Sequence, residues 1–307
     1  MPNIFATRYG NPKDEGAVVP INASPKMQKR TEYRRGSLAG STRLFAQCKL
    51  HGCTVGGFVM ASLMFVGGAV RPAAVQVGGT GGGDAGRGVM PDSESVGVSY
   101  DINWRSRLNP PLLNAVSTLI SFDVVEHNLQ RKSQGFWETA KMSSKMMKDN
   151  LEGGGSSKSA LYYDMLEKMF EVGGAMRERQ DKCSISTSAD INYSNCGRWN
   201  HETDYGKLGQ VQDIWMSESA PVGRCNVIGI LFTTCVNGKM NFSIAYSPHI
   251  LTDKYGVFLV DHVKDFCEGN VFDLNAPEDF TFEEYFEQHG NAVQSALPDA
   301  VVSHLNL

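Results

Sequence analysis

The residues of this 307-residue chain that could do chemistry are scattered along it, and few of them form a recognisable site. A serine hydrolase of the α/β type needs a Gly-x-Ser-x-Gly elbow, which this sequence lacks. Cys196 precedes Gly197 and could act as a nucleophile, but the sequence identifies no base to activate it. We therefore expect Cys196 to be a buried, inert thiol.

The metal-binding residue types are equally dispersed. His201 lies close to Glu202 and Asp204, but these are neighbours in a polar loop with no ligand spacing of a known kind. The seven cysteines include no Cys-x-x-Cys pair, which is typical of reduced thiols in the cytosol. We expect no bound metal, no resident cofactor and a cytoplasmic location.

Charge and glycine content argue against nucleotides and nucleic acids as ligands. Gly81, Gly83 and Gly86 spell a GxGxxG motif, but the Arg-Gly-Val-Met-Pro that follows is poorly suited to open the helix that such a motif needs. A surface loop is the favoured interpretation. The net charge of −4, without a long basic run, predicts no nucleic-acid partner.

One segment resembles a membrane span. Residues 54–70 are apolar except for Thr54 and Ser62, but this run of 17 residues includes four glycines and is slightly too short to cross a bilayer. A buried core helix is therefore favoured over membrane insertion.

Hydrophobic periodicity predicts the elements that must position any site. An Asn237-Gly238 turn is expected to join the last two strands as a hairpin. The order of elements favours an α/β (α+β) fold, a two-layer mixed β-sheet with helices packed on one face. The expected helices are residues 41–51, 54–70, 112–130, 136–151, 160–176 and 254–266, and the expected strands are 96–104, 189–194, 209–216, 226–236 and 240–246.

Composition divides the chain into three parts. Residues 1–36 lack periodicity and are expected to be a linker or extension, and residues 37–270 hold the predicted elements. Residues 271–307 form an acidic tail that either adds one helix or lies on the surface.

Five phrases between about residues 40 and 268 resemble, in order, the C-terminal half of the chloramphenicol-acetyltransferase-like acyltransferases, the superfamily of condensation domains and alcohol acetyltransferases. The resemblance implies that the fold is one half of that superfamily's fold. The phrases are STRLFAQCKLHGCTVGGFVMASLMF, DINWRSRL, GFWETAKMSSKMMKDNL, DINYSNCGRW and the stretch from Val227 to Glu268.

The resemblance assigns roles to a few residues. Asn103 and Arg105 match an Asn-x-Arg element, in which the arginine pairs with a catalytic-motif aspartate; an ordinary strand-end arginine is the alternative. Ser194, Asn195 and Gly197 match a segment near the active-site tunnel, where a donor could face an oxyanion. A simple turn explains the same three residue types and is favoured.

The catalytic motif of the superfamily, His-His-x-x-x-Asp, is missing. No two histidines are adjacent, and the run from His262 to Asp265 is one residue too short. The resemblance therefore implies an acyltransferase-superfamily protein, dependent on acyl-CoA or a carrier-bound thioester, that is inactive alone, and it implies small-molecule acyl donors and acceptors. A non-catalytic scaffold, or pseudoenzyme, is the alternative, and a longer natural chain is a third interpretation. A partner or self-association would cover the face of the missing half.

Overall fold

A computed structural model describes the chain in nine stretches, from β1 near the N-terminus to α8 near the C-terminus. The stretches are residues 30–78, 93–103, 120–130, 132–152, 191–217, 229–246, 248, 252–276 and 279–296, with residue 131 between the third and fourth left out.

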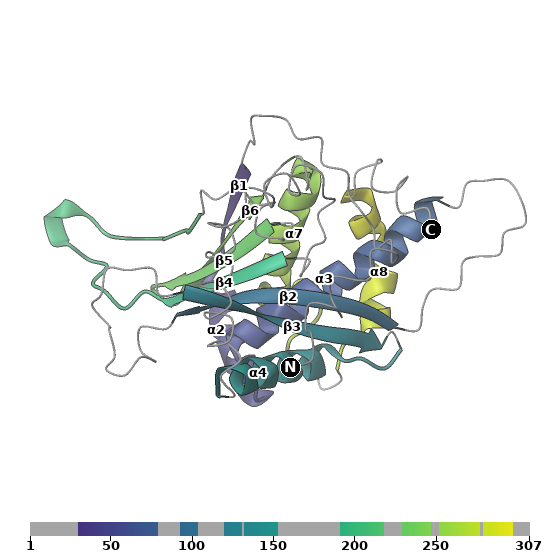
Figure 1. The fold of residues 1–307 in the computed structure, drawn as a ribbon. Coiled ribbons are helices and arrows are strands. Elements are labelled where there is room, and N and C mark those ends of the chain that lie inside the picture. The colour runs from purple at the N-terminus through teal and green to yellow at the C-terminus, as the bar shows by residue number, and fades with distance from the viewer. Residues whose placement is uncertain are drawn as a thin grey trace, which may run out of the picture.

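The described strands form one mixed sheet in the order β1-β6-β5-β4-β2-β3 (Figure 1). β4 pairs in parallel with both β2 and β5, whereas the other pairings are antiparallel. The carboxyl ends of β2, β4 and β5 therefore lie along the same edge of the sheet. The strands are β1 (Arg30–Arg35), β2 (Ser93–Asn103), β3 (Ile120–Gln130), β4 (Ile191–Arg198), β5 (Gly229–Val236) and β6 (Lys239–Tyr246).

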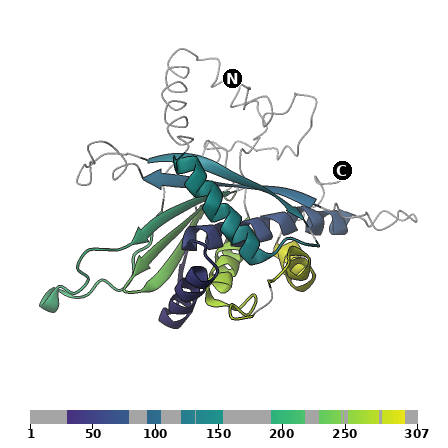
Figure 2. The same cartoon turned by 90° about the horizontal axis from the view of Figure 1, so that it is seen from below.

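The helices gather on one side of this sheet, as Figure 2 shows for α2, α3, α7 and α8. α3 contacts β2 and β4 and also α4, α7 and α8, so it is the centre of the helical layer. This architecture confirms the predicted two-layer α/β fold. The helices are α2 (Leu38–Leu50), α3 (Val55–Gly78), α4 (Phe136–Glu152), α7 (Asp253–Glu268) and α8 (Phe282–Ala296), with a short 3-10 helix η1 (Gly206–Leu208).

α3 is the predicted buried helix. Every side chain from Phe58 to Val66 is at most 2% exposed, which fits a run that is apolar on all sides. Within the described ranges, no single helix has the length and apolar character of a membrane span. α2 joined to Val55–Ala69 would pass that test, but the two are bent by 99°.

Aromatic rings join the helices to one another. The Phe136 ring of α4 lies 4.8 Å from Phe58 and 5.3 Å from Phe65 of α3, and 5.2 Å from Phe266 of α7. Edge-to-face and offset pairs at these separations add to the free energy of apolar burial. The helical layer is therefore one continuous aromatic core.

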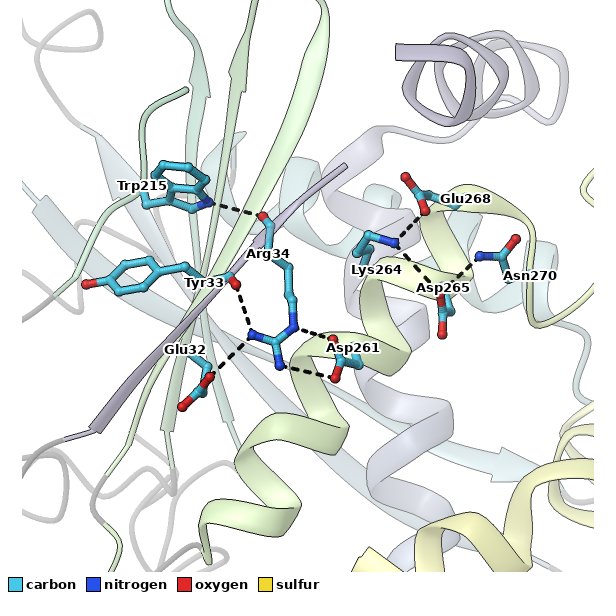
Figure 3. Close-up of polar contacts among 9 residues, drawn as sticks. All are labelled: Glu32, Tyr33, Arg34, Trp215, Asp261, Lys264, Asp265, Glu268 and Asn270. Atoms are coloured by element: carbon cyan, nitrogen blue, oxygen red, sulfur yellow. Dashed lines mark hydrogen bonds and ion pairs between the residues drawn. The ribbon is translucent and has the colours of Figure 1, made fainter. Parts of the chain in front are cut away.

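The sheet begins earlier than the sequence suggested. The expectation of a linker through residue 36 is wrong for Arg30–Arg35, which pair residue by residue with 241–246 of β6. Figure 3 shows the reason: the Arg34 guanidinium binds the Asp261 carboxylate of α7 through two nitrogens, and Nη1 also contacts Glu32 at 3.3 Å. A partner 227 residues away in sequence is invisible to local periodicity.

The acidic tail also belongs partly to the core. α8 packs on α3, and its Phe282 and Tyr285 are 2% and 0% exposed. Residues 282–296 are therefore a structural helix, so of the two alternatives for the acidic tail the structure has the added helix, and this helix packs into the core.

Two further element predictions are wrong. Residues 120–130 are not the end of a helix but strand β3, in which Val125, His127 and Leu129 are buried while Asn128 and Gln130 are exposed. That alternation with period two is the signature of a strand. Residues 209–216 form no strand. The expected helix at 160–176 and the GxGxxG segment lie outside the described residues.

Candidate functional site

The N-terminus of α3 is capped by side chains from two elements. Thr54 caps it, because its Oγ1 accepts a hydrogen bond of 2.9 Å from the Gly57 amide. Ser144 of α4 supports the cap, since its Oγ accepts from the Thr54 amide at 2.9 Å and lies 3.1 Å from Thr54 Oγ1. A helix N-terminus carries a partial positive charge, so this turn favours negative charge nearby.

Two parallel strands bring polar residues to the same edge of the sheet. The register aligns Tyr100 of β2 with Tyr193 of β4, and Asp101 and Ser194 follow these two residues. Asn192 Nδ2 donates to Asp101 Oδ1 at 3.1 Å, which ties the two strands together. Asn103 is exposed at the end of β2 and Ser194 is half-buried, so both predicted site residues lie at this edge.

Asn195 connects the strand end to α3. Its Oδ1 accepts a 2.9 Å hydrogen bond from the amide of Gly197, whose φ of +73° suits glycine. These residues lie within β4, where its register with β5 shifts before Arg198, so the predicted turn takes the form of a bulge in the strand. A Cβ placed on Gly56 would lie 3.7 Å from Asn195 Nδ2, so the amide of this side chain adjoins the first turn of α3. The turn thus holds a hydrogen-bond donor beside the positive end of a helix.

Cys196 differs from its prediction in one respect. The residue is exposed rather than buried, and it lies in β4 where the register with β5 shifts between Asn195 and Arg198. Partial burial of its sulfur and the nearby Asp101 carboxylate nevertheless raise the pKa of the thiol, against the effect of the Ser194 side chain, which lowers it. A raised pKa keeps a thiol protonated and makes it a poor nucleophile.

The remaining predicted residues do not join this site in the described part of the chain. Arg105 lies outside the described residues, so its pairing stays a prediction. The loop near His201 uses its carboxylate internally: Asp204 accepts from the Gly206 amide at 2.9 Å and from Gln210 at 3.0 Å, which lowers the pKa of Asp204. The described stretches contain no group of three side chains able to hold a metal ion.

The residues that sequence reasoning missed are those that shape α3's first turn. Thr54 carried a signal, since a threonine before Gly-Gly and an apolar run is typical of a helix cap. Ser144 and Asp101 carried none, because their importance comes from contacts across elements. In chemical terms, the site offers donors and a helix dipole for a developing negative charge.

No family model matches this sequence, and no curated protein matches it. Solved structures do share its fold. The chain is similar to the trichothecene 15-O-acetyltransferase TRI3 of Fusarium sporotrichioides, with a TM-score of 0.53, 13% identity and coverage of 78% of this chain and 46% of that one. It is also similar to the condensation domain of the Monacolin K polyketide synthase MokA, with a TM-score of 0.51, 11% identity and coverage of 87% and 52%.

A third similar structure is the four-domain nonribosomal peptide synthetase AB3403, with a TM-score of 0.55 and 12% identity over 88% of this chain and 19% of that one. The chain therefore spans about half the length of the acetyltransferase and of the condensation domain. At these identities the likeness concerns the fold. This chain has the fold of about half of a chloramphenicol-acetyltransferase-like acyltransferase, as its sequence phrases predicted.

Proposed function

We propose that this chain is the half of a thioester-dependent acyltransferase that holds the acyl donor, and that another polypeptide supplies the catalytic base. The donor would be acyl-CoA or a carrier-bound thioester, and the acceptor a small alcohol or amine. The observation that carries the proposal is the half-length likeness to an acetyltransferase and a condensation domain, combined with Asn195 beside the N-terminus of α3.

The proposed chemistry follows from these groups. Attack on a thioester carbonyl places negative charge on its oxygen, and an amide donor beside a helix N-terminus stabilises such charge. A base must also remove the proton of the acceptor, and it must lie within hydrogen-bond reach of that proton. The sequence has no adjacent histidines to form the superfamily's motif. We therefore expect binding of the donor but no turnover by this chain alone.

One projecting segment of the described chain is a candidate contact for the missing half. We name residues 199–210 the arm, which extends away from the sheet (Figure 1). At its tip Leu208 is 92% exposed and Tyr205 is 48% exposed. Exposed apolar side chains on a projecting segment are typical of a contact with another protein. The arm supports the proposal that a partner or a second copy covers this side.

The test uses the purified full chain with acetyl-CoA and a longer acyl-CoA. Calorimetry should detect binding of the acyl-CoA, and release of free CoA in the presence of alcohols or amines should be at background. The Asn195→Ala variant should weaken binding about 5- to 10-fold, as expected for a lost hydrogen bond to a charged or polarised group. Asn200→Ala, at an exposed asparagine nearby, is the matched control.

The alternative is a scaffold that has kept the fold without the chemistry. The lack of adjacent histidines favours it, because the superfamily's motif would supply the base. A defined complex without any acyl-CoA binding would support the scaffold. Turnover by the chain alone would instead show that a base exists outside the superfamily motif, and would contradict the proposed need for a second polypeptide.

A further inference from the structure

The turn between α2 and α3 brings two cysteines together. The Cys53 amide donates to the Cys48 carbonyl at 3.0 Å, and the Gly52 amide donates to the Lys49 carbonyl at 3.3 Å. Gly52 has a φ of +68°. This is the Schellman arrangement for the end of a helix, in which the residue after the left-handed glycine contacts the residue five positions earlier. In this chain those two positions are both cysteine.

The geometry suits a disulfide. A backbone hydrogen bond of 3.0 Å from one residue to the other limits their α-carbon separation to about 7 Å, near the upper end of the range that disulfides span. Both thiols are free. Each thiol also shifts the pKa of the other, which indicates that the two side chains lie near each other.

The two thiols have different surroundings. Cys48 is 3% exposed, and its hydrogen bond to Cys53 together with burial raises its pKa. Cys53 is half-buried, and the hydrogen bond from Cys48, with the positive charge of Lys141 on α4, lowers its pKa. Cys53 is therefore the thiol that ionises first, and it is the one that solvent can reach.

We propose that Cys53 and Cys48 form a peroxide-responsive dithiol, in which peroxide oxidises Cys53 and Cys48 is its resolving partner. The Cys53 thiolate attacks one oxygen of hydrogen peroxide, which forms an S–O bond and breaks the O–O bond, so that a sulfenic acid forms and water leaves after protonation. The Cys48 sulfur then attacks the Cys53 sulfur, which forms the S–S bond and releases the sulfenic oxygen as a second water. Overall, two thiols are oxidised by two electrons and one peroxide is reduced.

The location gives the bond a structural consequence. Cys53 directly precedes Thr54, the cap of α3, and the first turn of that helix adjoins Asn195. Oxidation would fasten the end of α2 to the start of α3. This inference is independent of acyl transfer, because it concerns only the thiols and their turn.

The experiment treats the full chain with hydrogen peroxide, blocks the remaining thiols with N-ethylmaleimide and digests with trypsin. Cleavage after Lys49 separates Cys48 from Cys53. The expected product is a reducible species that joins the peptide of residues 44–49 to the peptide that begins at Leu50. Recovery of both peptides alkylated, or linkage of Cys53 to a different cysteine, would overturn the proposal.

Reaction rates in the unmodified chain provide a test that needs no variant. At pH 7, iodoacetamide should alkylate Cys53 roughly 3- to 10-fold faster than Cys196, although Cys196 is the more exposed residue. Lys141→Gln should slow alkylation of Cys53, whereas the matched change Lys145→Gln, at another exposed lysine of the same helix, should not. Faster labelling of Cys196 would contradict the assignment of Cys53 as the reactive thiol.

Cysteine variants separate the two roles. In Cys48→Ser, the sulfenic acid of Cys53 should persist and be captured by dimedone, while Cys196→Ser should form the disulfide as before. Dimedone capture at Cys48 in the Cys53→Ser chain, at the rate seen for Cys53, would reverse the two roles and refute the proposal.

Discussion

The helical layer and the carboxyl edge of the sheet differ in almost every physical property. In the helical layer, the Phe136 and Phe266 rings are 0% exposed and lie 5.2 Å apart. At the edge, Asn195 and Cys196 are exposed, and Leu208 of the arm is 92% exposed. The comparison indicates that most of the stability comes from the helical layer, whereas the side chains of the proposed site lie at the edge. The four predictions below test that separation.

The largest effect on stability is expected from removing an aromatic ring of the helical layer. Phe136→Ala removes a ring that contacts Phe58, Phe65 and Phe266, and should lower the free energy of unfolding by about 3–5 kcal/mol. Urea unfolding followed by circular dichroism measures it. A loss below about 1 kcal/mol would show that the helical layer is not the main source of stability.

Acid should weaken the same layer. His262 is 8% exposed, its ring lies 5.0 Å from that of His289, and burial followed by the charge of His289 lowers its pKa to about 4. The ordinary pKa of about 6.5 is higher, so the unfolded chain binds a proton more readily. Stability is then fully present above about pH 6.5 and falls as the pH drops toward 4, by up to about 3 kcal/mol.

Unfolding measured between pH 7 and pH 4 tests this dependence. His262→Phe should flatten the curve across that window, while His201→Gln, at an exposed histidine, should leave its shape unchanged. An unaltered curve in His262→Phe would mean that other groups control the acid response.

Two neighbouring glycines should respond in opposite directions. A Cβ on Gly57 would lie 2.0 Å from Ser144 Oγ and 2.5 Å from the Ala140 carbonyl, so Gly57→Ala should cost about 1–3 kcal/mol. A Cβ on Gly56 meets nothing closer than 3.5 Å, and Gly56→Ala should be neutral or stabilise by up to about 1 kcal/mol. Equal effects in thermal unfolding would contradict the close packing of α3 on α4.

The smallest effect on stability is expected at the arm. Leu208→Ser should change the free energy of unfolding by less than about 0.5 kcal/mol, because the side chain is 92% exposed. The same variant should weaken any self-association measured by light scattering. A clear loss of stability without a change in association would show that Leu208 contributes to folding and not to association.

The separation of the two regions also explains which predictions succeeded. α3 was predictable because an unbroken apolar run can lie only in a core or a membrane, and the β5–β6 hairpin was predictable because Asn237 and Gly238 accept positive φ values, here +52° and +77°. β3 was misread as a helix, since its alternating burial is resolved only when the opposing strand β2 is known.

The candidate site was only partly foreseen. Asn103, Ser194, Asn195 and Gly197 were predicted from their resemblance to an ordered set of phrases, and they lie at the edge of the sheet. Thr54, Ser144 and Asp101 were not predicted, because each makes its hydrogen bond with a residue of another element. The Cys48 and Cys53 pair was missed as well, since their contact depends on how α2 ends.

The sequence by itself determined the elements whose signals are local: the buried α3, the amphipathic α4 and α7, and the Asn237-Gly238 turn. Only the tertiary structure decided that the polar segment Arg30–Arg35 is a strand, because Arg34 needs Asp261 of α7 to hold it. It likewise placed Asn195 beside the first turn of α3. Such contacts join residues far apart in the chain, and a local pattern of residue types carries no record of them.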